Sequence, residues 1–343
     1  MGRVLPLLLV TAAWFFGVAA GTRHRWVHLH PTNEVREFLS SRVTPKTRFL
    51  YHEQLVDFFK ETRLGRIWNL LSNEIRDNAV SHYMVQANKL HEQDPSQLGA
   101  LSRTQCGYLL SSLRFLDPAC HYPVAHKVFA AWRAKDPPKS AYPLTLELTE
   151  GLAGIMCMAG HRWEAICLLL CFSALLMVGE ALMVRWEHVF LPESWAADQR
   201  GSIYIPHSKT GYHQYVPLLD PGLVNLLRYW KNLLVPAAGD FLFNFAYNHY
   251  RNGLLGAIRV LRLNPKWFRS HSARRGGATK LLFDSGSVDL VLLVGRWSSI
   301  RAARTYIRKG EALMAKLRAS QSAETEQVLN TVRAELIRLL FDM

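Results

Sequence analysis

The sequence has few of the features that mark an oxidised or glycosylated protein. It contains five cysteines in 343 residues, no Cys-x-x-Cys pair and no Asn-x-Ser/Thr site for N-glycosylation. The cysteines lie mostly in apolar runs, at Cys106, Cys120, Cys157, Cys167 and Cys171. An odd number without paired spacing excludes a disulfide framework and a cysteine-based zinc site. These residues are typical of small core side chains in a reducing compartment.

Acidic residues are scarce between Arg251 and Lys309. This stretch has thirteen Lys and Arg residues against two acids, Asp284 and Asp289, a net charge of +11 in a chain whose total is +14. Ten of the thirteen are arginines, whose planar guanidinium binds phosphate through two parallel hydrogen bonds. Such an excess usually marks a protein that meets nucleic acid or an anionic membrane. A solvated basic face is the alternative interpretation.

A long apolar run opens the chain. Residues 1–21 carry one basic residue, Arg3, and then an apolar run from Val4 to Ala20 that ends in small residues. The pattern is typical of a secretory signal, and it is short for a membrane anchor. The lack of glycosylation sites and of paired cysteines points the other way. A signal, an anchor and an upstream segment foreign to the folded protein all remain open.

Apolar residues three and four positions apart predict helices along most of the remaining chain. The first group lies at 50–62, 72–93, 98–116 and 122–134. It indicates a helical domain at 46–134. Residues 135–143, with three prolines and no periodicity, are the expected linker.

Two further helices are predicted at 144–160 and 163–186. The second is almost wholly apolar but is interrupted by Glu164 and Glu180, which favours a buried core helix over a membrane span. Two β-rich runs between Ser202 and Leu218 then predict a hairpin with Lys209 near its tip. The expected fold class is therefore mainly α with a small β-hairpin or sheet (α+β).

A basic cluster follows in "HSARRGGATK". A helix that starts near His271 would place Arg274 and Arg275 in its first turn, where the helix dipole disfavours cations. A phosphate bound at this N-terminus would offset that cost. By itself the cluster favours the other interpretation, a surface helix decorated with His and Arg side chains.

Two aromatic residues follow the His271-x-x-Arg274 cluster: Trp297 lies in a glycine-containing turn, and Tyr306 comes nine residues later. This order resembles the catalytic end of the tyrosine recombinase (phage integrase) family, in which a His-x-x-Arg box precedes a His or Trp and then the nucleophilic tyrosine. Lys209 matches the lysine of the family's hairpin. The resemblance covers about residues 140–310, and it implies a catalytic domain at 144–318, a DNA-clamping role for 46–134 and a C-terminal helix at 319–343.

The resemblance implies DNA cleavage and rejoining through a 3′-phosphotyrosyl intermediate formed by Tyr306. Arg274 would bind the non-bridging oxygens, and Trp297 would offer its indole N–H. His271 would assist proton transfer from the tyrosine, and Lys209 would protonate the leaving 5′-oxygen. No metal or other cofactor is expected, because cationic side chains supply the electrostatic stabilisation. The expected DNA contacts come from Arg275, Arg296, Arg301, Arg304, Arg308 and Lys309.

One member of this catalytic set is missing. Aligning the family's Gly-Leu-Arg-x-x-Glu box on Glu180 places Met177 where the family has an arginine, and no arginine lies between Trp163 and Val184. Loss of one transition-state donor typically costs about 2.7–4 kcal/mol, or roughly a hundred- to a thousandfold in rate. The sequence therefore favours DNA binding over efficient recombination. A weakened recombinase and a non-catalytic DNA-binding relative derived from a mobile element both remain open.

The expected partner is double-stranded DNA, and the expected location is on DNA in the nucleus or cytoplasm. An apolar stripe in the tail, which includes Val328, Leu329, Val332 and Leu336, fits either a contact with a second protomer or an intramolecular core helix. Family members often dock such a helix on a neighbour, which would give a homo-oligomer on DNA. A secreted or membrane-tethered helical protein is the third interpretation, and it follows from residues 1–21.

Overall fold

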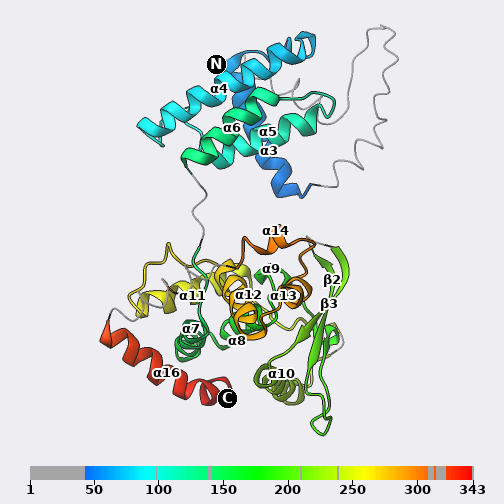
Figure 1. The fold of residues 1–343 in the computed structure, drawn as a ribbon, viewed down its shortest axis with the longest axis vertical. Helices are drawn as coiled ribbons and strands as arrows, with labels where there is room; N and C mark the ends of the chain where they lie inside the picture. The colour runs from blue at the N-terminus through cyan, green and yellow to red at the C-terminus, as the bar shows by residue number, and fades with distance from the viewer. Residues whose placement is uncertain are drawn as a thin grey trace, which may run out of the picture. The chain divides into compact units, whose positions relative to one another are not determined.

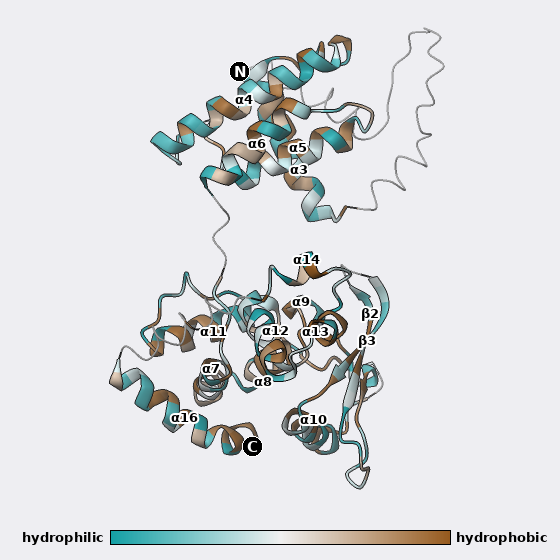
Figure 2. Ribbon diagram, in the orientation of Figure 1, coloured by the Kyte–Doolittle hydropathy of each residue, from teal (hydrophilic) through white to brown (hydrophobic). Residues whose placement is uncertain are grey.

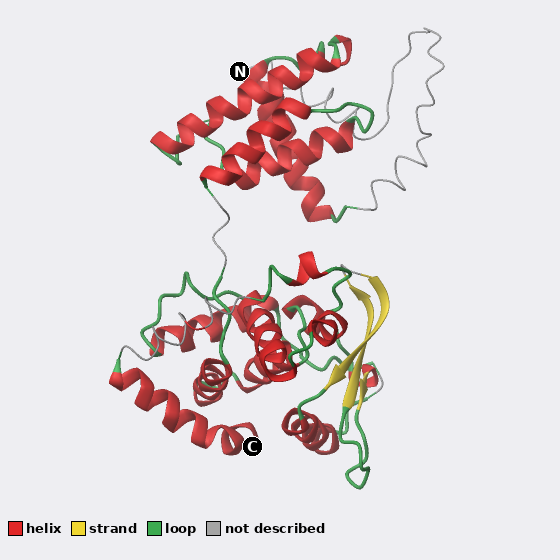
Figure 3. Ribbon diagram, viewed as in Figure 1, coloured by secondary structure: helices red, strands yellow, loops and turns green. Residues whose placement is uncertain are grey.

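A computed structural model describes residues 43–97, 99–136, 141–208, 211–237, 239–307, 313 and 322–341. Contacts divide the chain into two units between Lys139 and Ser140. The described residues form helices and one small antiparallel sheet, so the predicted α+β class is confirmed (Figures 1 and 3). The predicted segment 1–21 lies outside them. Within the described ranges, no helix is both long and apolar enough to cross a bilayer.

The first unit is helical. Its elements are α3 (Pro45–Thr62), a 3-10 turn η1 (Trp68–Leu70), α4 (Asn73–Gln93), α5 (Arg103–Leu116) and α6 (Pro123–Lys135). Hydrophilic and hydrophobic residues alternate along α4 and α6 (Figure 2), as expected for helices that bury one face. α3 packs against α5 and α4 against α6, around a core that includes Phe58, Met84 and Leu113.

A buried carboxylate joins two of these helices. Asp77 of α4 is 3% exposed, and its two oxygens accept hydrogen bonds from the backbone N–H groups of Val124 and Ala125, at 2.8 and 2.9 Å. These N–H groups belong to the first turn of α6, where no helical partner exists. Asp77 therefore caps α6 from a neighbouring helix.

The second unit contains the sheet and most of the helices. Its helices are α7 (Leu146–Met158), α8 (Arg162–Ser173), α9 (Val178–Ala181), α10 (Pro221–Leu234), α11 (Tyr247–Val260), α12 (His271–Ser285), α13 (Val288–Gly295), α14 (Ile300–Ala303) and α16 (Ala323–Phe341), with a 3-10 turn η2 (Trp186–His188). The strands β1 (Val189–Phe190), β2 (Gly201–Ser208) and β3 (Gly211–Leu218) pair in that order. Gly201 pairs with Leu218 and Ser208 with Gly211, which confirms the predicted hairpin.

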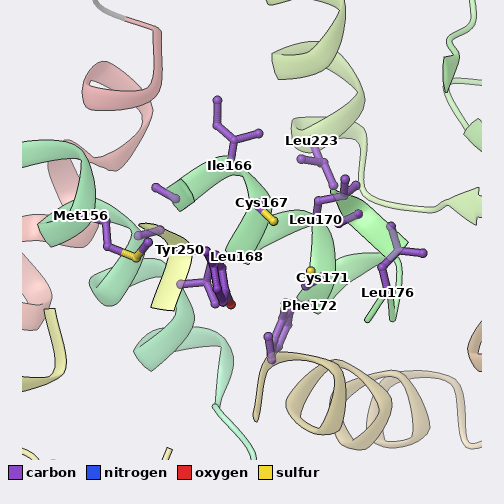
Figure 4. Packing of buried hydrophobic residues seen from close by; sticks show 14 of the residues in the cluster. Met156, Ile166, Cys167, Leu168, Leu170, Cys171, Phe172, Leu176, Leu223 and Tyr250 are labelled. Carbon is purple, nitrogen blue, oxygen red and sulfur yellow. The ribbon is translucent and has the colours of Figure 1, made fainter. Parts of the chain in front are cut away.

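α8 lies at the centre of the second unit. Leu168, Leu170 and Phe172 project from it into the core (Figure 4), and it packs against α7, α11 and α12. This explains why the sequence of α8 is apolar on every side: a helix surrounded by others has no solvent face.

The prediction of one helix over 163–186 is wrong. The helix ends at Ser173, Leu175 has a left-handed backbone (φ 50°), and Met177 is extended before the short helix α9 begins. Leu175 and Leu176 are each 1% exposed, so burial of these side chains holds a backbone that a leucine otherwise avoids. The break carries Glu180 away from the axis of α8.

α12 starts at His271, as predicted, and lies very close to its neighbours. A Cβ on Gly276 would lie 1.8 Å from the carbonyl oxygen of Leu144, and one on Gly277 would lie 1.8 Å from that of Phe172. Only glycine allows this approach of helix to backbone. The two glycines thereby fix the position of α12, and with it Arg274.

The tail helix α16 packs on its own chain. Leu329 and Val332 lie against Gly151 and Gly154 of α7, where a Cβ would meet them at 2.2 and 2.1 Å. The indole N–H of Trp230 donates to the carbonyl oxygen of Leu340 at 3.1 Å. Of the two interpretations of the apolar stripe, the described structure has the intramolecular one.

Candidate functional site

The site is built around Arg274 of α12, whose side chain is 2% exposed. Its Nη2 donates to the carbonyl oxygen of Gly295 at 2.7 Å, and its Nη1 lies 3.4 Å from Oε2 of Glu180. The guanidinium carbon is 5.0 Å from the ring centre of Trp297 and 5.4 Å from that of Tyr306. Three of the residues predicted to act together therefore do lie together.

A tight turn after α13 positions Trp297. α13 ends at Gly295, and a Cβ there would lie 2.1 Å from the indole ring, so the ring folds back over this glycine. Trp297 is 8% exposed, and its ring centre is 4.7 Å from that of Tyr306 with 34° between the planes. The indole thus fixes the half-buried Tyr306 ring on one face.

The nucleophile candidate follows α14 closely. Ser299 caps this one-turn helix by accepting a hydrogen bond from the N–H of Ala302, and the N–H of Tyr306 donates to Ala303 at 2.8 Å. These local bonds explain the nine-residue interval between Trp297 and Tyr306, because one short helix returns the chain to the indole.

Glu180 is the acidic centre of the site, a role that sequence reasoning missed. It accepts bonds from both Nη atoms of Arg296, at 2.6 and 3.1 Å, and from the backbone N–H of Met177 at 2.9 Å. Its side chain is 5% exposed and that of Arg296 is 6% exposed. The available signal was a carboxylate near the end of an apolar run, since such a group is buried only with a partner.

Arg296 was predicted to contact DNA, and its guanidinium is directed to Glu180 instead of to solvent. It reaches this position from a left-handed backbone with φ 56°. Its Nη1 also lies 3.2 Å from Oε1 of Gln214 on β3. Arg296 therefore joins the turn after α13 to α9 and to the hairpin.

The described end of the hairpin is tied to this cluster. Ser208 donates to Oε1 of Gln214 at 2.9 Å, and the same oxygen accepts from Arg296. Lys209, the predicted acid for the leaving oxygen, lies outside the described residues. Its neighbour Ser208 is 7% exposed and faces the site.

The buried cluster carries an excess of positive charge. Two arginines, Arg274 and Arg296, share one carboxylate, Glu180, which leaves a formal charge of +1. Burial lowers the pKa of Arg274 from its ordinary value, Glu180 opposes this shift, and Arg296 adds to it. An anion at this place would relieve the desolvation and the repulsion together.

A cleft of about 420 Å³ opens beside the cluster. It is lined by Met177, Val178, Gly179, Glu180, Met183, His207, Ser208, Tyr247, Ser270 and His271. The exposed His271 and Met177, the residue that aligns in sequence with an arginine of the family, therefore both line this cleft.

The other predicted DNA contacts are distributed unevenly. Arg301 and Arg304 are exposed. Arg275 is half-buried and donates to the carbonyl oxygen of Ala141 at 2.6 Å. Arg308 and Lys309 lie outside the described residues. No group of three His, Cys, Asp or Glu side chains in the described ranges could hold a metal ion.

The sequence matches no protein-family model and no curated protein. The structure is similar to the XerH site-specific recombinase bound to palindromic difH substrate, with a TM-score of 0.52 and 15% identity over 79% of this chain and 78% of that chain. It is also similar to the Tn1549 transposon integrase in complex with circular intermediate DNA, with a TM-score of 0.51 and 16% identity over 82% of this chain and 98% of that chain. The predicted resemblance to tyrosine recombinases is confirmed as a resemblance of fold, at 15–16% sequence identity.

Proposed function

We propose that this protein binds double-stranded DNA and can form a covalent bond between Tyr306 and a DNA 3′-phosphate, as a tyrosine recombinase of reduced activity. The observation that carries the proposal is the convergence of Arg274, Trp297 and Tyr306 in a buried basic cluster beside the His271 cleft. The two similar structures are both DNA complexes, which supports DNA as the partner. Residues 46–134 would clamp the duplex with the catalytic domain at 144–318, joined by the linker 135–143.

In the proposed step, the phenol oxygen of Tyr306 attacks the phosphorus and the bond from phosphorus to the 5′-oxygen breaks. His271 takes part in moving the phenolic proton, and Lys209 gives a proton to the 5′-oxygen. Arg274 stabilises the charge that gathers on the non-bridging oxygens. Rejoining is the reverse, with a 5′-hydroxyl as the nucleophile, so no energy source is consumed.

Exposed arginines suit the DNA-binding part of the proposal. Arg301 and Arg304 lie within five residues of Tyr306 and project to solvent, where they can reach phosphates on either side of the scissile one. Contacts of this kind are independent of sequence and weaken with salt.

The test uses the full chain and a labelled pool of nicked duplexes with a randomised centre. A nick beside the cleavage site releases the 5′-hydroxyl strand, which traps the protein on the DNA. Wild type is expected to give an adduct that survives denaturation, and Tyr306→Phe none. The matched control is Tyr215→Phe, which removes a phenol that is 63% exposed on β3 and should leave the adduct in place.

The second candidate function is DNA binding without catalysis, and Met177 is the observation that favours it. In that case wild type and Tyr306→Phe bind the pool equally, with the same dependence on salt, and neither forms an adduct. Loss of all binding in both proteins would remove both candidates.

A further inference from the structure

Arg296 is the residue in the site that the proposed function leaves without a task. It adopts a left-handed backbone (φ 56°), which L-residues other than glycine avoid, and its long cationic side chain is 6% exposed. Both features lower stability, so we infer that the guanidinium has a role at the place where it is held. It is held against the carboxylate of Glu180, which also contacts Arg274.

Glu180 alone would cancel the charge of Arg274. Its Oε2 is 3.4 Å from Nη1 of Arg274, and a buried pair of this kind is neutral overall. Arg296 binds the same carboxylate more closely, at 2.6 Å. With both arginines present the cluster keeps one positive charge, and the charge of Arg274 remains available to an anion.

The two guanidinium groups also keep unused donors. Each has five N–H bonds; described residues accept two from Arg274 and three from Arg296. The Nε atoms of both side chains are buried without a hydrogen-bond acceptor among the described residues. Buried donors of this kind are costly, and an oxyanion with several lone pairs would satisfy them.

We propose that Arg296 restores the second positive charge of a phosphate site from which the arginine at position 177 is absent. This inference rests on the proposed function for its ligand, a phosphodiester. Arg296 and Met177 come from different elements: Arg296 lies in the turn after α13, whereas Met177 precedes α9. The guanidinium of Arg296 and the backbone N–H of Met177 both donate to Oε2 of Glu180. The carboxylate of Glu180 thus binds both the backbone of Met177, where the family has an arginine, and Arg296, the arginine proposed to replace it.

A rescue experiment separates this role from a structural one. Inorganic phosphate is titrated into the full chain at constant ionic strength, and binding is followed by the shift in Tm and by calorimetry. Arg296→Gln is expected to weaken phosphate binding about tenfold or more, the loss of a charge-assisted bond. Met177→Arg in the Arg296→Gln background should restore binding, and Met177→Arg in wild type should change it much less. Arg259→Gln, which removes an exposed cation of α11 that is not among the proposed DNA contacts, is the matched control and should leave this binding unchanged.

The adduct assay on the same variants keeps the two proposals distinct. If wild type forms the adduct and Arg296→Gln forms it at an equal rate, the inference about Arg296 is overturned and the proposed function stands. If wild type binds no DNA, the proposed function fails, and the phosphate titration still decides the role of Arg296. Failure of Met177→Arg to rescue a folded Arg296→Gln protein, judged by circular dichroism, would show that Arg296 only holds Glu180 in place.

Discussion

Replacing Gly277 with alanine is expected to destabilise the second unit and to displace Arg274 from its position beside Trp297 and Tyr306. The added Cβ would lie 1.8 Å from the carbonyl oxygen of Phe172, whereas ordinary contact begins at 3.4 Å. The two backbones would have to separate by about 1.6 Å, and neither can yield as a flexible side chain would. Gly277 lies one turn after Arg274, so the displacement reaches the site directly.

The magnitude follows from two opposed effects. Alanine in a helix interior is more favourable than glycine by about 0.5–1 kcal/mol, and overpacking of a core costs about 1–3 kcal/mol. Because the obstacle is backbone, we take the upper end and expect a net loss of about 2 kcal/mol. For a unit of this size that is a fall in Tm of about 4–8 °C.

Gly256 of α11 is the matched control. It also lies inside a helix, but an added Cβ there meets nothing within 4 Å. Gly256→Ala should therefore raise Tm slightly, by the helix-propensity gain alone. Thermal unfolding followed by circular dichroism compares the two, and the nicked-duplex assay should show about a hundredfold slower adduct formation for Gly277→Ala, the usual result of a displacement near 1 Å. Equal Tm values for the two variants would refute the close-packing argument.

Three further predictions concern other parts of the chain. Val332→Asp buries a carboxylate against Gly154 and should detach α16, seen as a lower Tm and faster proteolysis of the tail; unchanged cleavage would contradict the intramolecular docking. Asp77→Ala leaves the buried N–H of Ala125 and the part-buried N–H of Val124 unpaired and should destabilise the first unit by about 1–3 kcal/mol, measured by urea unfolding, with Asn as the milder variant. Burial raises the pKa of the Cys106 thiol to about 12, so at pH 8 almost no thiolate exists and alkylation should require unfolding; rapid labelling of the native protein would disprove this.

Local patterns predicted the elements that depend on local forces. The helices of the first unit follow from amphipathic periodicity, and the hairpin follows from two β-rich runs around Gly211. The start of α12 at His271 and the order of Arg274, Trp297 and Tyr306 were also legible in the sequence. These features depend on residues that lie close together along the chain.

The break after α8 was not predictable in this way. Ala174, Leu175 and Leu176 are apolar and include no glycine or proline, so nothing local ends the helix. The left-handed Leu175 is held by burial of its side chain, which is a property of the packed unit. Tertiary packing overrides the helical preference of leucine here.

The pairing of Arg296 with Glu180 was missed for a related reason. Their positions differ by 116 residues, and a basic segment with few acids predicts solvent or phosphate as the partner of every arginine. Only the fold brings the carboxylate of Glu180, at the end of an apolar run, to the guanidinium of Arg296. The sequence therefore indicated the charge of the segment correctly but not the environment of this one side chain.

The shared carboxylate of Glu180 constrains how this site can change during evolution. If Glu180 were lost first, two buried arginines would face each other without a counter-ion; if Arg296 were lost first, the cluster would be neutral. Positions 177, 180 and 296 should therefore covary among relatives, and an arginine gained at 177 should release Arg296 from selection. Relatives with an arginine at position 177 are expected to differ from this chain first at position 296, whose backbone is left-handed.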